Sequence, residues 1–448
     1  MSRVARHRAA FHTLGCKVNQ SDTAAFQKRL QAHGFEIVPF EASADVYIIN
    51  SCVVTTTAAQ KSRQTVRKIR RREPEALIIL AGCYPEMRPS LPTSQRSIFD
   101  ALPFDAIIGI RDRDRLVEQV LEMVKPPPAP GDPLPSESVL PSSSRPIVKA
   151  QEGCDEFCHY CVVPYVRGPM RSRAPAAILD DVEALVGQGH REIVLAGTHL
   201  GAYERSAGGE GSLSALVARL AEIDGDWRLR LSSIEPMDLD RSLLLVMAKA
   251  PRVVEHLHLP LQSGSDRILK AMGRRYTTAE LQDIVVFARR LMPNIGVTTD
   301  VLVGFPGEQE SDHEATLALI EKLGFSRVHV FPFSPRPKTM AKRMPDPVAS
   351  DVKRRRRDEM LGKAQKLAER FHRQQQGELL EVLVEQKHPI EKVPFPLPKT
   401  RGVCYYGYSR NYVPVWIASE AELSLGQTVC VRIRSSNSQG CFVQLKST

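Results

Sequence analysis

The stretch CDEFCHYC, residues 154–161, spaces three cysteines as C-x3-C-x2-C and follows the short apolar run of residues 146–150. Three thiolates this close together suit one soft metal centre. A structural zinc ion takes four ligands, and no further cysteine follows for more than two hundred residues. The spacing therefore favours an iron–sulfur cluster held by three cysteines, with one iron left open. A zinc site completed by His159 is the alternative.

Strand and helix patterns alternate around this stretch between residues 146 and 345. The candidate strands are residues 147–150, 192–197, 228–233, 254–259, 296–303 and 327–331. The candidate helices between them are residues 174–187, 213–223, 239–248, 277–291 and 308–323. Six such units predict a parallel but incomplete (β/α) barrel, because a closed barrel has eight. The three cysteines follow the first strand, at the end of the barrel where active sites lie.

Polar and glycine-rich turns follow the other strands, at residues 197–199, 232–236, 260–265 and 304–308. Small residues let a nucleoside approach the backbone, and carboxylates or amides bind ribose hydroxyls. The turns therefore suit a ligand with adenine, ribose and an amino acid. Each polar residue also has a simpler interpretation as a loop cap.

Residues 8–125 show the same alternation, with strands at 11–14, 46–49, 77–81 and 105–108 and helices at 21–33, 57–72 and 113–124. This pattern predicts a mostly parallel, doubly wound sheet. Cys16, Cys52 and Cys83 each follow a strand. Carboxyl ends of parallel strands share one edge, so we expect the three thiols to form a second metal centre there. Three ordinary buried cysteines are the alternative.

Two segments with different sequence patterns follow the barrel. Residues 348–375 are highly charged with helical spacing, which predicts a solvated helix packed on the barrel or, less simply, an RNA contact. Five short strands follow, at residues 380–384, 403–408, 413–417, 428–433 and 441–445, and predict a small antiparallel β-barrel. Its aromatic and basic residues either bind RNA or fill the core: Tyr405, Tyr406, Tyr408, Tyr412 and Arg410. Cys404, Cys430 and Cys441 fit core positions.

Composition limits the remaining choices. The predicted segments are residues 8–125, a Pro/Ser-rich linker at 126–145, the barrel with its helix at 146–375 and the small β-barrel at 376–448. The net charge of +10 permits a nucleic-acid partner, and the basic helix at 61–72 is either an RNA contact or a solvated face. No apolar run reaches transmembrane length and no signal peptide is evident, so we expect a cytoplasmic protein without a membrane partner. Nine cysteines in such a compartment suggest metal or redox work.

Several motifs resemble those of the radical S-adenosylmethionine (SAM) methylthiotransferases, over essentially the whole chain. They are the three-cysteine stretch, GCKVNQ at 15–20, NSCVVT at 50–55, GCY at 82–84, HLHLPLQSGS at 256–265 and GFPGE at 304–308. RGP at 167–169 and RSR at 171–173 also match. Residues 17–20 are similar to the subgroup that acts on N6-threonylcarbamoyladenosine in tRNA, and residues 407–412 resemble an RNA-binding TRAM domain. Lys338 departs from the family, which usually has glycine there.

The resemblance implies a transferase that adds a methylthio group to C2 of N6-threonylcarbamoyladenosine at position 37 of tRNA. This carbon is unactivated and lacks an acidic proton, so radical chemistry is needed. A [4Fe–4S] cluster on Cys154, Cys158 and Cys161 would cleave SAM to a 5′-deoxyadenosyl radical. A second [4Fe–4S] cluster on Cys16, Cys52 and Cys83 would carry the sulfur, and a second SAM would supply the methyl group.

The resemblance also implies partners and SAM contacts. The partners are the tRNA anticodon loop and an external electron donor such as a flavodoxin or ferredoxin. The SAM-contacting side chains expected by resemblance are Ser233, Glu235, Gln262 and Asp300. The alternatives are a methylthiotransferase acting on isopentenyl-adenosine in tRNA or on a ribosomal protein, and, in another class, a non-catalytic zinc-containing RNA-binding protein.

Overall fold

The computed structural model describes residues 7–124, 144–204, 211–389, 393–395 and 403–445. The chain forms two compact units. The first unit contains the described part of residues 1–142 together with residues 152–170 and 334–343. The second contains residues 144–151, 171–333 and 344–445, again where described. Most of the predicted linker at 126–145 lies outside the described residues, and the predicted domain limits stay a prediction.

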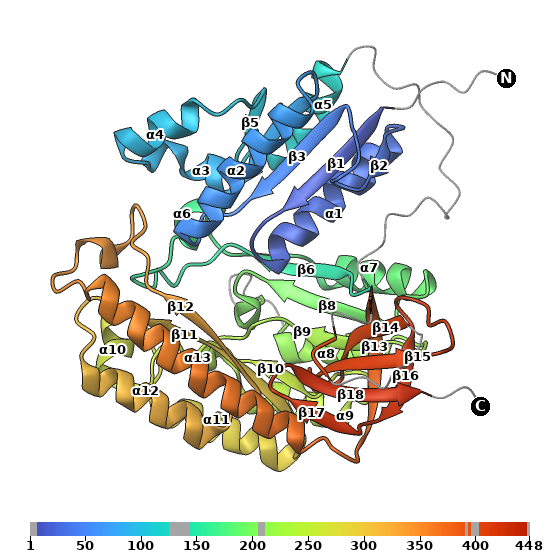
Figure 1. The fold of residues 1–448 in the computed structure, drawn as a ribbon, viewed down its shortest axis with the longest axis vertical. Helices are drawn as coiled ribbons and strands as arrows, with labels where there is room; N and C mark the ends of the chain where they lie inside the picture. The colour runs from blue at the N-terminus through green and yellow to red at the C-terminus, as the bar shows by residue number, and fades with distance from the viewer. Residues whose placement is uncertain (1–6, 125–143, 205–210, 390–392, 396–402, 446–448) are drawn as a thin grey trace. The chain divides into compact units, whose positions relative to one another are not determined.

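A five-stranded parallel sheet, in the order β2-β1-β3-β4-β5, forms the centre of the first unit (Figure 1). Its strands are β1 (Arg8–Thr13), β2 (Glu36–Val38), β3 (Val46–Ser51), β4 (Leu77–Gly82) and β5 (Ala106–Ile108). The helices are α1 (Lys17–Ala32), α2 (Thr56–Arg72), α3 (Cys83–Met87), α4 (Thr93–Asp100), α5 (Leu116–Met123) and α6 (Val163–Arg167). The predicted doubly wound sheet is confirmed, and β2, α3, α4 and α6 are additions that the sequence patterns did not reveal.

Successive side chains of the strands point into two different cores, because side chains alternate across a strand. Ile48 packs with Phe26 and Leu116 on the face that α1 and α5 cover. Its neighbour Ile49 packs with Val66 of α2 on the other face. Residues 162 and 166, beside the three-cysteine stretch, also join this second core. This part of the chain is therefore built into the first unit.

Six parallel strands, each of the last five preceded by a helix, form the main part of the second unit. The strands are β6 (Ile147–Glu152), β8 (Glu192–Gly197), β9 (Arg228–Leu231), β10 (His256–His258), β11 (Gly296–Val303) and β12 (Arg327–Pro332). The helices are α7 (Pro175–Gly187), α8 (Leu213–Ala221), α9 (Arg241–Lys249), α10 (Asp266–Ala271), α11 (Thr278–Leu291) and α12 (Glu310–Leu323). A two-residue strand, β7 (Arg171–Ser172), flanks β6. The predicted partial barrel is confirmed.

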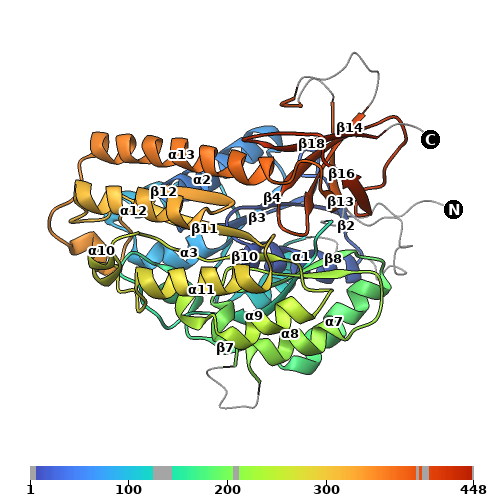
Figure 2. The same cartoon turned by 90° about the horizontal axis from the view of Figure 1, so that it is seen from below.

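The strands fall into two sheets that backbone hydrogen bonds connect. One sheet has the order β7-β6-β8-β9 and the other β10-β11-β12. The amide of Leu229 donates to the carbonyl of Arg252 at 2.8 Å, and the amide of Val254 donates to the carbonyl of Leu229 at 3.0 Å. These two bonds join β9 to the segment just before β10, so the two sheets form one continuous curved wall. The long helix α13 (Ser350–Arg373) then packs along β12 (Figure 2), as the prediction of a helix packed on the barrel has it.

The C-terminal sheet has the order β16-β13-β14-β15-β18-β17. Its strands are β13 (Leu379–His388), β14 (Val403–Ser409), β15 (Pro414–Ser419), β16 (Thr428–Arg432), β17 (Ser435–Asn437) and β18 (Gly440–Leu445). All of its pairs are antiparallel except β15 with β18, which are parallel. The sequence pattern did not predict β17. This strand forms a hairpin with β18, and β18 then lies beside β15 in the same direction.

Candidate metal centres

Cys16, Cys52 and Cys83 follow β1, β3 and β4, and their side chains gather around one asparagine. The thiols of Cys16 and Cys83 lie 3.9 and 3.8 Å from Oδ1 of Asn19. Gly15 has a φ of +101°, and a Cβ on it would lie 2.9 Å from Sγ of Cys52. The structure thus brings the three thiols to the carboxyl edge of the sheet. We call Cys16, Cys52 and Cys83 the edge trio.

Asn19 is fixed from several directions. Its Nδ2 donates to the carbonyls of Leu14 at 2.8 Å and Ser51 at 3.0 Å. Asn50 donates in turn to the backbone carbonyl of Asn19 at 2.8 Å. Because α1 starts at Lys17, earlier than residue 21 as predicted, Asn19 stands in its first turn. This residue of the KVNQ motif therefore ties the Cys16 turn to the end of β3.

A buried arginine lies beside the edge trio. The Arg167 side chain is 2% exposed, and it donates to Oδ1 of Asn19, to Asp22 at 3.2 Å and to Glu152 at 2.6 Å. Burial lowers the pKa of Arg167, but the neighbouring Cys83 and Asp22 more than offset this, so the pKa is raised overall. Arg167 belongs to a sequence motif, but its position as a buried counter-charge is visible only in the fold.

The edge trio has the chemistry of a metal site. Burial raises the pKa of the Cys52 thiol, and it raises that of Cys83 to about 12. Both thiols are therefore protonated at neutral pH when no metal is bound, and binding must release their protons. Cys16 is exposed, which gives access from solvent. Three thiols with a cation beside them fit an iron–sulfur cluster.

The second group is Cys154, Cys158 and Cys161, which we call the loop trio. A tight backbone turn presents it: the amide of Cys161 donates to the carbonyl of Cys158 at 2.8 Å, and Phe157 has a φ of 47°. Gly153 precedes the turn, and a Cβ there would stand 1.9 Å from the carbonyl oxygen of Pro169. Only glycine fits this close approach of two backbones.

The spacing of the ligand atoms bears on the zinc alternative. Among the described residues, the one set of three or more His, Cys, Asp or Glu ligand atoms within 4.8 Å of one another is His258, Asp300 and His329. Neither trio of thiols, with or without His159, is that compact. Ligands of one zinc ion lie close together around it, whereas each thiolate of a cubane binds a different iron.

A segment from the end of the barrel, residues 334–343, also belongs to the first unit. The amide of Ala341 donates to the carbonyl of His159 at 2.8 Å. Nε of Arg336 donates to the carbonyl of Val54 at 3.0 Å, and the amide of Val54 in turn points to Sγ of Cys52 at 3.5 Å. Arg336 is 7% exposed, and burial lowers its pKa to about 10. The segment thus contacts the loops of both trios.

The residues expected to contact SAM all lie in the second unit. Ser233 and Glu235 follow β9, Gln262 precedes β11, and Asp300 lies on β11. Glu235 accepts a hydrogen bond from the buried Arg274. Gln262, with a φ of 64°, joins β11 through backbone bonds to Asp300 at 2.8 Å and Leu302 at 2.9 Å. The Asp300 carboxylate lies 3.2 Å from Nε2 of His258. Ser233 is half-buried after β9. Their role as SAM contacts stays a prediction.

Some basic residues of helix α2 bond within the first unit, and others are exposed to solvent. Arg70 pairs with Asp105 at 2.5 Å, and Arg72 donates to the Tyr47 hydroxyl at 3.0 Å, so these two stabilise the unit itself. The exposed cations of the helix other than Arg72 are Lys61, Arg67, Lys68 and Arg71. These four remain available to a partner.

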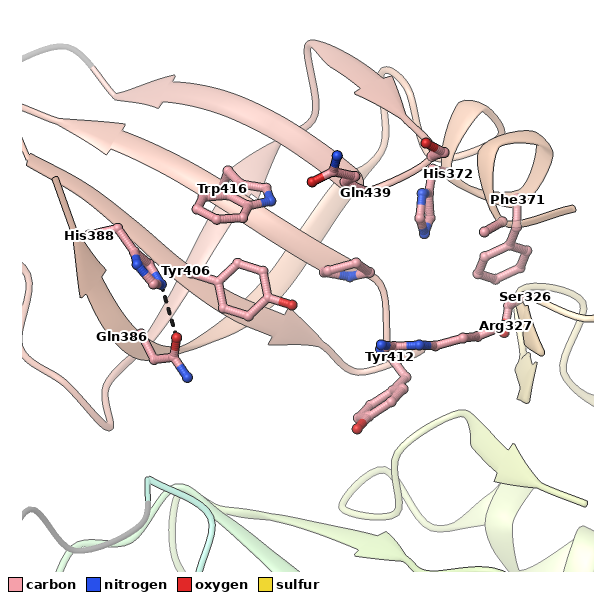
Figure 3. Close-up of a pocket in the computed structure, with 13 residues that line it drawn as sticks. Ser326, Arg327, Phe371, His372, Gln386, His388, Tyr406, Tyr412, Trp416 and Gln439 are labelled. Carbon is pink, nitrogen blue, oxygen red and sulfur yellow. Dashed lines mark hydrogen bonds between the residues drawn. The ribbon is translucent and has the colours of Figure 1, made fainter. Parts of the chain in front are cut away.

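The aromatic residues of the C-terminal sheet are similarly divided. Tyr405 is 1% exposed and lies in the core, and Arg410 pairs with Glu255 at 2.9 Å. Tyr408 stacks on Tyr412 with ring centroids 4.5 Å apart. Tyr406 and Tyr412 both line a cavity (Figure 3). Two of the five residues considered for RNA contact therefore serve the fold, which the strand pattern alone could not separate.

Comparisons with known proteins agree with this architecture. Residues 148–320 match the Radical SAM superfamily, and residues 8–107 match a family described as uncharacterized protein family UPF0004. A solved radical SAM methyltransferase, TsrM from Kitasatospora setae, superposes with a TM-score of 0.52 at 14% identity, covering 72% of this chain and 73% of its own. The fold is therefore that of a radical SAM protein.

Relatives that match over nearly the full length show which kind of radical SAM protein this chain is. A threonylcarbamoyladenosine tRNA methylthiotransferase of Bacillus subtilis is 34% identical, over 97% of this chain and 96% of its own. A tRNA-2-methylthio-N(6)-dimethylallyladenosine synthase of Carboxydothermus hydrogenoformans is also 34% identical, over 85% and 88%. The chain belongs to the radical SAM methylthiotransferase family, whose members use SAM and two [4Fe–4S] clusters. Among the described helices, none is both long and apolar enough to cross a membrane.

Proposed function

We propose that this protein adds a methylthio group to C2 of N6-threonylcarbamoyladenosine at position 37 of tRNA. The observation that carries the proposal is the presence of two separate trios of thiols in one unit. The substrate is supported by the KVNQ motif after Cys16 and by relatives with that printed activity. Relatives acting on dimethylallyl-adenosine are equally similar, so that base is the second candidate.

The two trios have different tasks in this proposal. The loop trio holds the cluster that binds SAM, and the edge trio holds the cluster that carries sulfur. When bound, the two clusters supply the electron that cleaves SAM and the site for the sulfur atom. The chain itself holds these groups apart from one another on separate loops. Arg167 and Arg336 add two buried positive charges near the edge trio, which favour thiolates there.

SAM would lie along the carboxyl ends of the barrel strands, contacted by Ser233, Glu235, Gln262 and Asp300. Gln262 is the best placed of these by backbone geometry, because its left-handed φ of 64° turns the chain sharply at the end of the β10 segment. Such strained residues often mark ligand sites. Glu235 and Asp300 already have cationic or imidazole partners, which orient their carboxylates.

The partners in this proposal are the tRNA anticodon loop and an external donor of electrons, such as a flavodoxin or ferredoxin. The exposed cations of α2 suit phosphate contacts. All nine cysteines are free thiols, as the reducing cytoplasm would keep them.

The experiment is mass spectrometry of tRNA nucleosides from cells with and without the gene. Loss of 2-methylthio-N6-threonylcarbamoyladenosine on deletion supports the proposal. Loss of the isopentenyl form instead keeps the chemistry but changes the base. No change in any tRNA nucleoside contradicts a tRNA substrate. Metal analysis then separates a protein-modifying enzyme, with about eight irons per chain, from a zinc-containing binding protein, with about one or two zincs.

A further inference from the structure

Two histidines and one aspartate face one another on three neighbouring strands of the barrel, β10, β11 and β12 (Figure 1). His258 ends β10, Asp300 lies in β11 and His329 lies in β12. In the strand register, Asp300 pairs with His329, and His258 pairs with Thr298, two residues before Asp300. Because alternate residues of a strand share a face, the three side chains leave the sheet on the same side. We call His258, Asp300 and His329 the strand triad.

The side that carries the strand triad is the inner face of the barrel. The alternate residues Val297 and Val328 instead pack in the same core as Ile320 of α12, on the face that the helices cover. Asp300 stands three residues before the end of β11, which is about 10 Å along the strand. The strand triad therefore lies inside the barrel, below the turns at its carboxyl edge.

The ligand atoms of the strand triad are close to one another. One atom from each side chain lies within 4.8 Å of the other two, which no other group of three or more His, Cys, Asp or Glu achieves in the part of the chain that the structure describes. Nε2 of His258 lies 3.2 Å from the Asp300 carboxylate. Ligands of one tetrahedral zinc ion lie about 3.3–3.5 Å apart, so the side chains have to close by about 1 Å to share an ion.

The hydroxyl of Thr298 fixes the orientation of His258. This hydroxyl donates to the carbonyl of Leu257 at 3.4 Å, and it lies 2.8 Å from Nδ1 of His258. Because its one proton is used, it accepts from Nδ1, and the lone pair of a neutral His258 is then on Nε2, facing Asp300. A lone pair and a carboxylate repel each other unless a cation lies between them.

We propose that the strand triad binds one divalent transition-metal ion through two imidazole nitrogens and one carboxylate oxygen. These are ligands that such ions, Zn²⁺ among them, bind well. Three protein ligands leave a coordination position for water on the side of the barrel interior. The ion would be separate from the iron of the two thiol trios. Asp300 has two carboxylate oxygens, so an ion on one oxygen leaves the other for the SAM contact expected of this residue.

The test uses Zn²⁺ as the probe and the cluster-loaded protein, because empty thiol trios would bind zinc themselves. Elemental analysis after gel filtration measures the bound metal, and about one zinc per chain is expected beside the iron. Thr298→Val removes the hydroxyl that orients His258, so zinc affinity should fall about 10–100-fold. Asp300→Asn and His329→Ala each remove a ligand, so they should lower the affinity further.

His33→Ala is the matched control, because it removes an imidazole that is exposed at the end of α1, in the other unit. It should bind zinc as the wild type does. Melting temperatures give a second measurement, since an ion that binds only the folded state raises the melting temperature. Zinc should raise it for the wild type and His33→Ala but not for Asp300→Asn, and the zinc-free values show whether each variant is folded.

The metal site is refuted if the loaded wild type holds no more zinc than Asp300→Asn, in which case a proton bridges His258 and the carboxylate. It is also refuted if His329→Ala binds zinc as tightly as His33→Ala. Either result with normal tRNA methylthiolation leaves the proposed function intact. Conversely, zinc bound at the strand triad of a protein that methylthiolates no tRNA would keep the metal site and reject the proposed function.

Discussion

The loop trio and the edge trio each consist of three cysteines, but the chain brings the cysteines together in different ways. Cys154, Cys158 and Cys161 lie within eight residues, so one turn of the backbone places them. Cys16, Cys52 and Cys83 are brought together by the parallel order of β1, β3 and β4. The loop trio depends on local geometry, and the edge trio depends on the whole sheet.

The difference extends to the environment of the thiols. Burial raises the pKa of Cys52 and Cys83, and the buried Arg167 compensates with positive charge. In the loop trio, Cys158 is buried and Cys154 and Cys161 are half-buried. The edge trio depends on residues from several parts of the chain, Arg167 among them. It should respond to changes far away in the sequence, whereas the loop trio should respond to its own backbone.

The largest effect should come from the cysteines themselves. Changing Cys52 to Ala should abolish the methylthiolated product but leave SAM cleavage to 5′-deoxyadenosine, with iron falling from about eight to about four per chain. Cys158→Ala should abolish both reactions. Chromatography of 5′-deoxyadenosine and mass spectrometry of the RNA measure the two outputs. Loss of SAM cleavage in the Cys52 variant would contradict separate tasks for the trios.

The loop trio could be predicted from the sequence alone, because its three cysteines lie within eight residues. The sequence was also sufficient for the location of the edge trio, since strand ends of a parallel sheet must meet. It could not reveal Arg167 as a counter-charge, because Asn19, Asp22 and Glu152 come together only in the fold. Similarly, the return of β18 beside β15 depends on a three-residue strand too short to show a period.

The second effect concerns the counter-charge. Replacing Arg167 with Met leaves Asp22 and Glu152 without this buried partner and should cost about 3–5 kcal/mol of unfolding free energy. Denaturant unfolding measures it, and iron analysis should show loss from the edge trio. Arg88→Met is the control in the same unit: Arg88 pairs with Asp100 on the surface, so a much smaller loss of stability is expected. If both variants lost the same unfolding free energy, Arg167 would not be the centre of a buried ion-pair network.

A pair of glycine variants should separate the trios by backbone strain. Gly15→Ala forces a left-handed φ and places a Cβ 2.7 Å from Cβ of Cys52, so cluster loading of the edge trio should fall. Gly153→Ala meets the Pro169 carbonyl and should disturb the loop trio instead. Each should cost about 1–3 kcal/mol or more. Iron content and SAM cleavage identify the damaged trio, and identical losses in both variants would refute the distinction.

The smallest effect tests the one motif position that departs from the family. Lys338 has a φ of 67°, in the left-handed region that favours glycine, which explains why the family has glycine there. The segment that it belongs to contacts the loops of both trios. Lys338→Gly should therefore raise the unfolding free energy by about 0.5–1 kcal/mol, since relief of about 1–2 kcal/mol of strain exceeds the added flexibility of the unfolded chain. Lys338→Ala removes the same charge but keeps a Cβ, so it should give no gain. A gain of the same size in both variants would assign the effect to the charge rather than to the backbone.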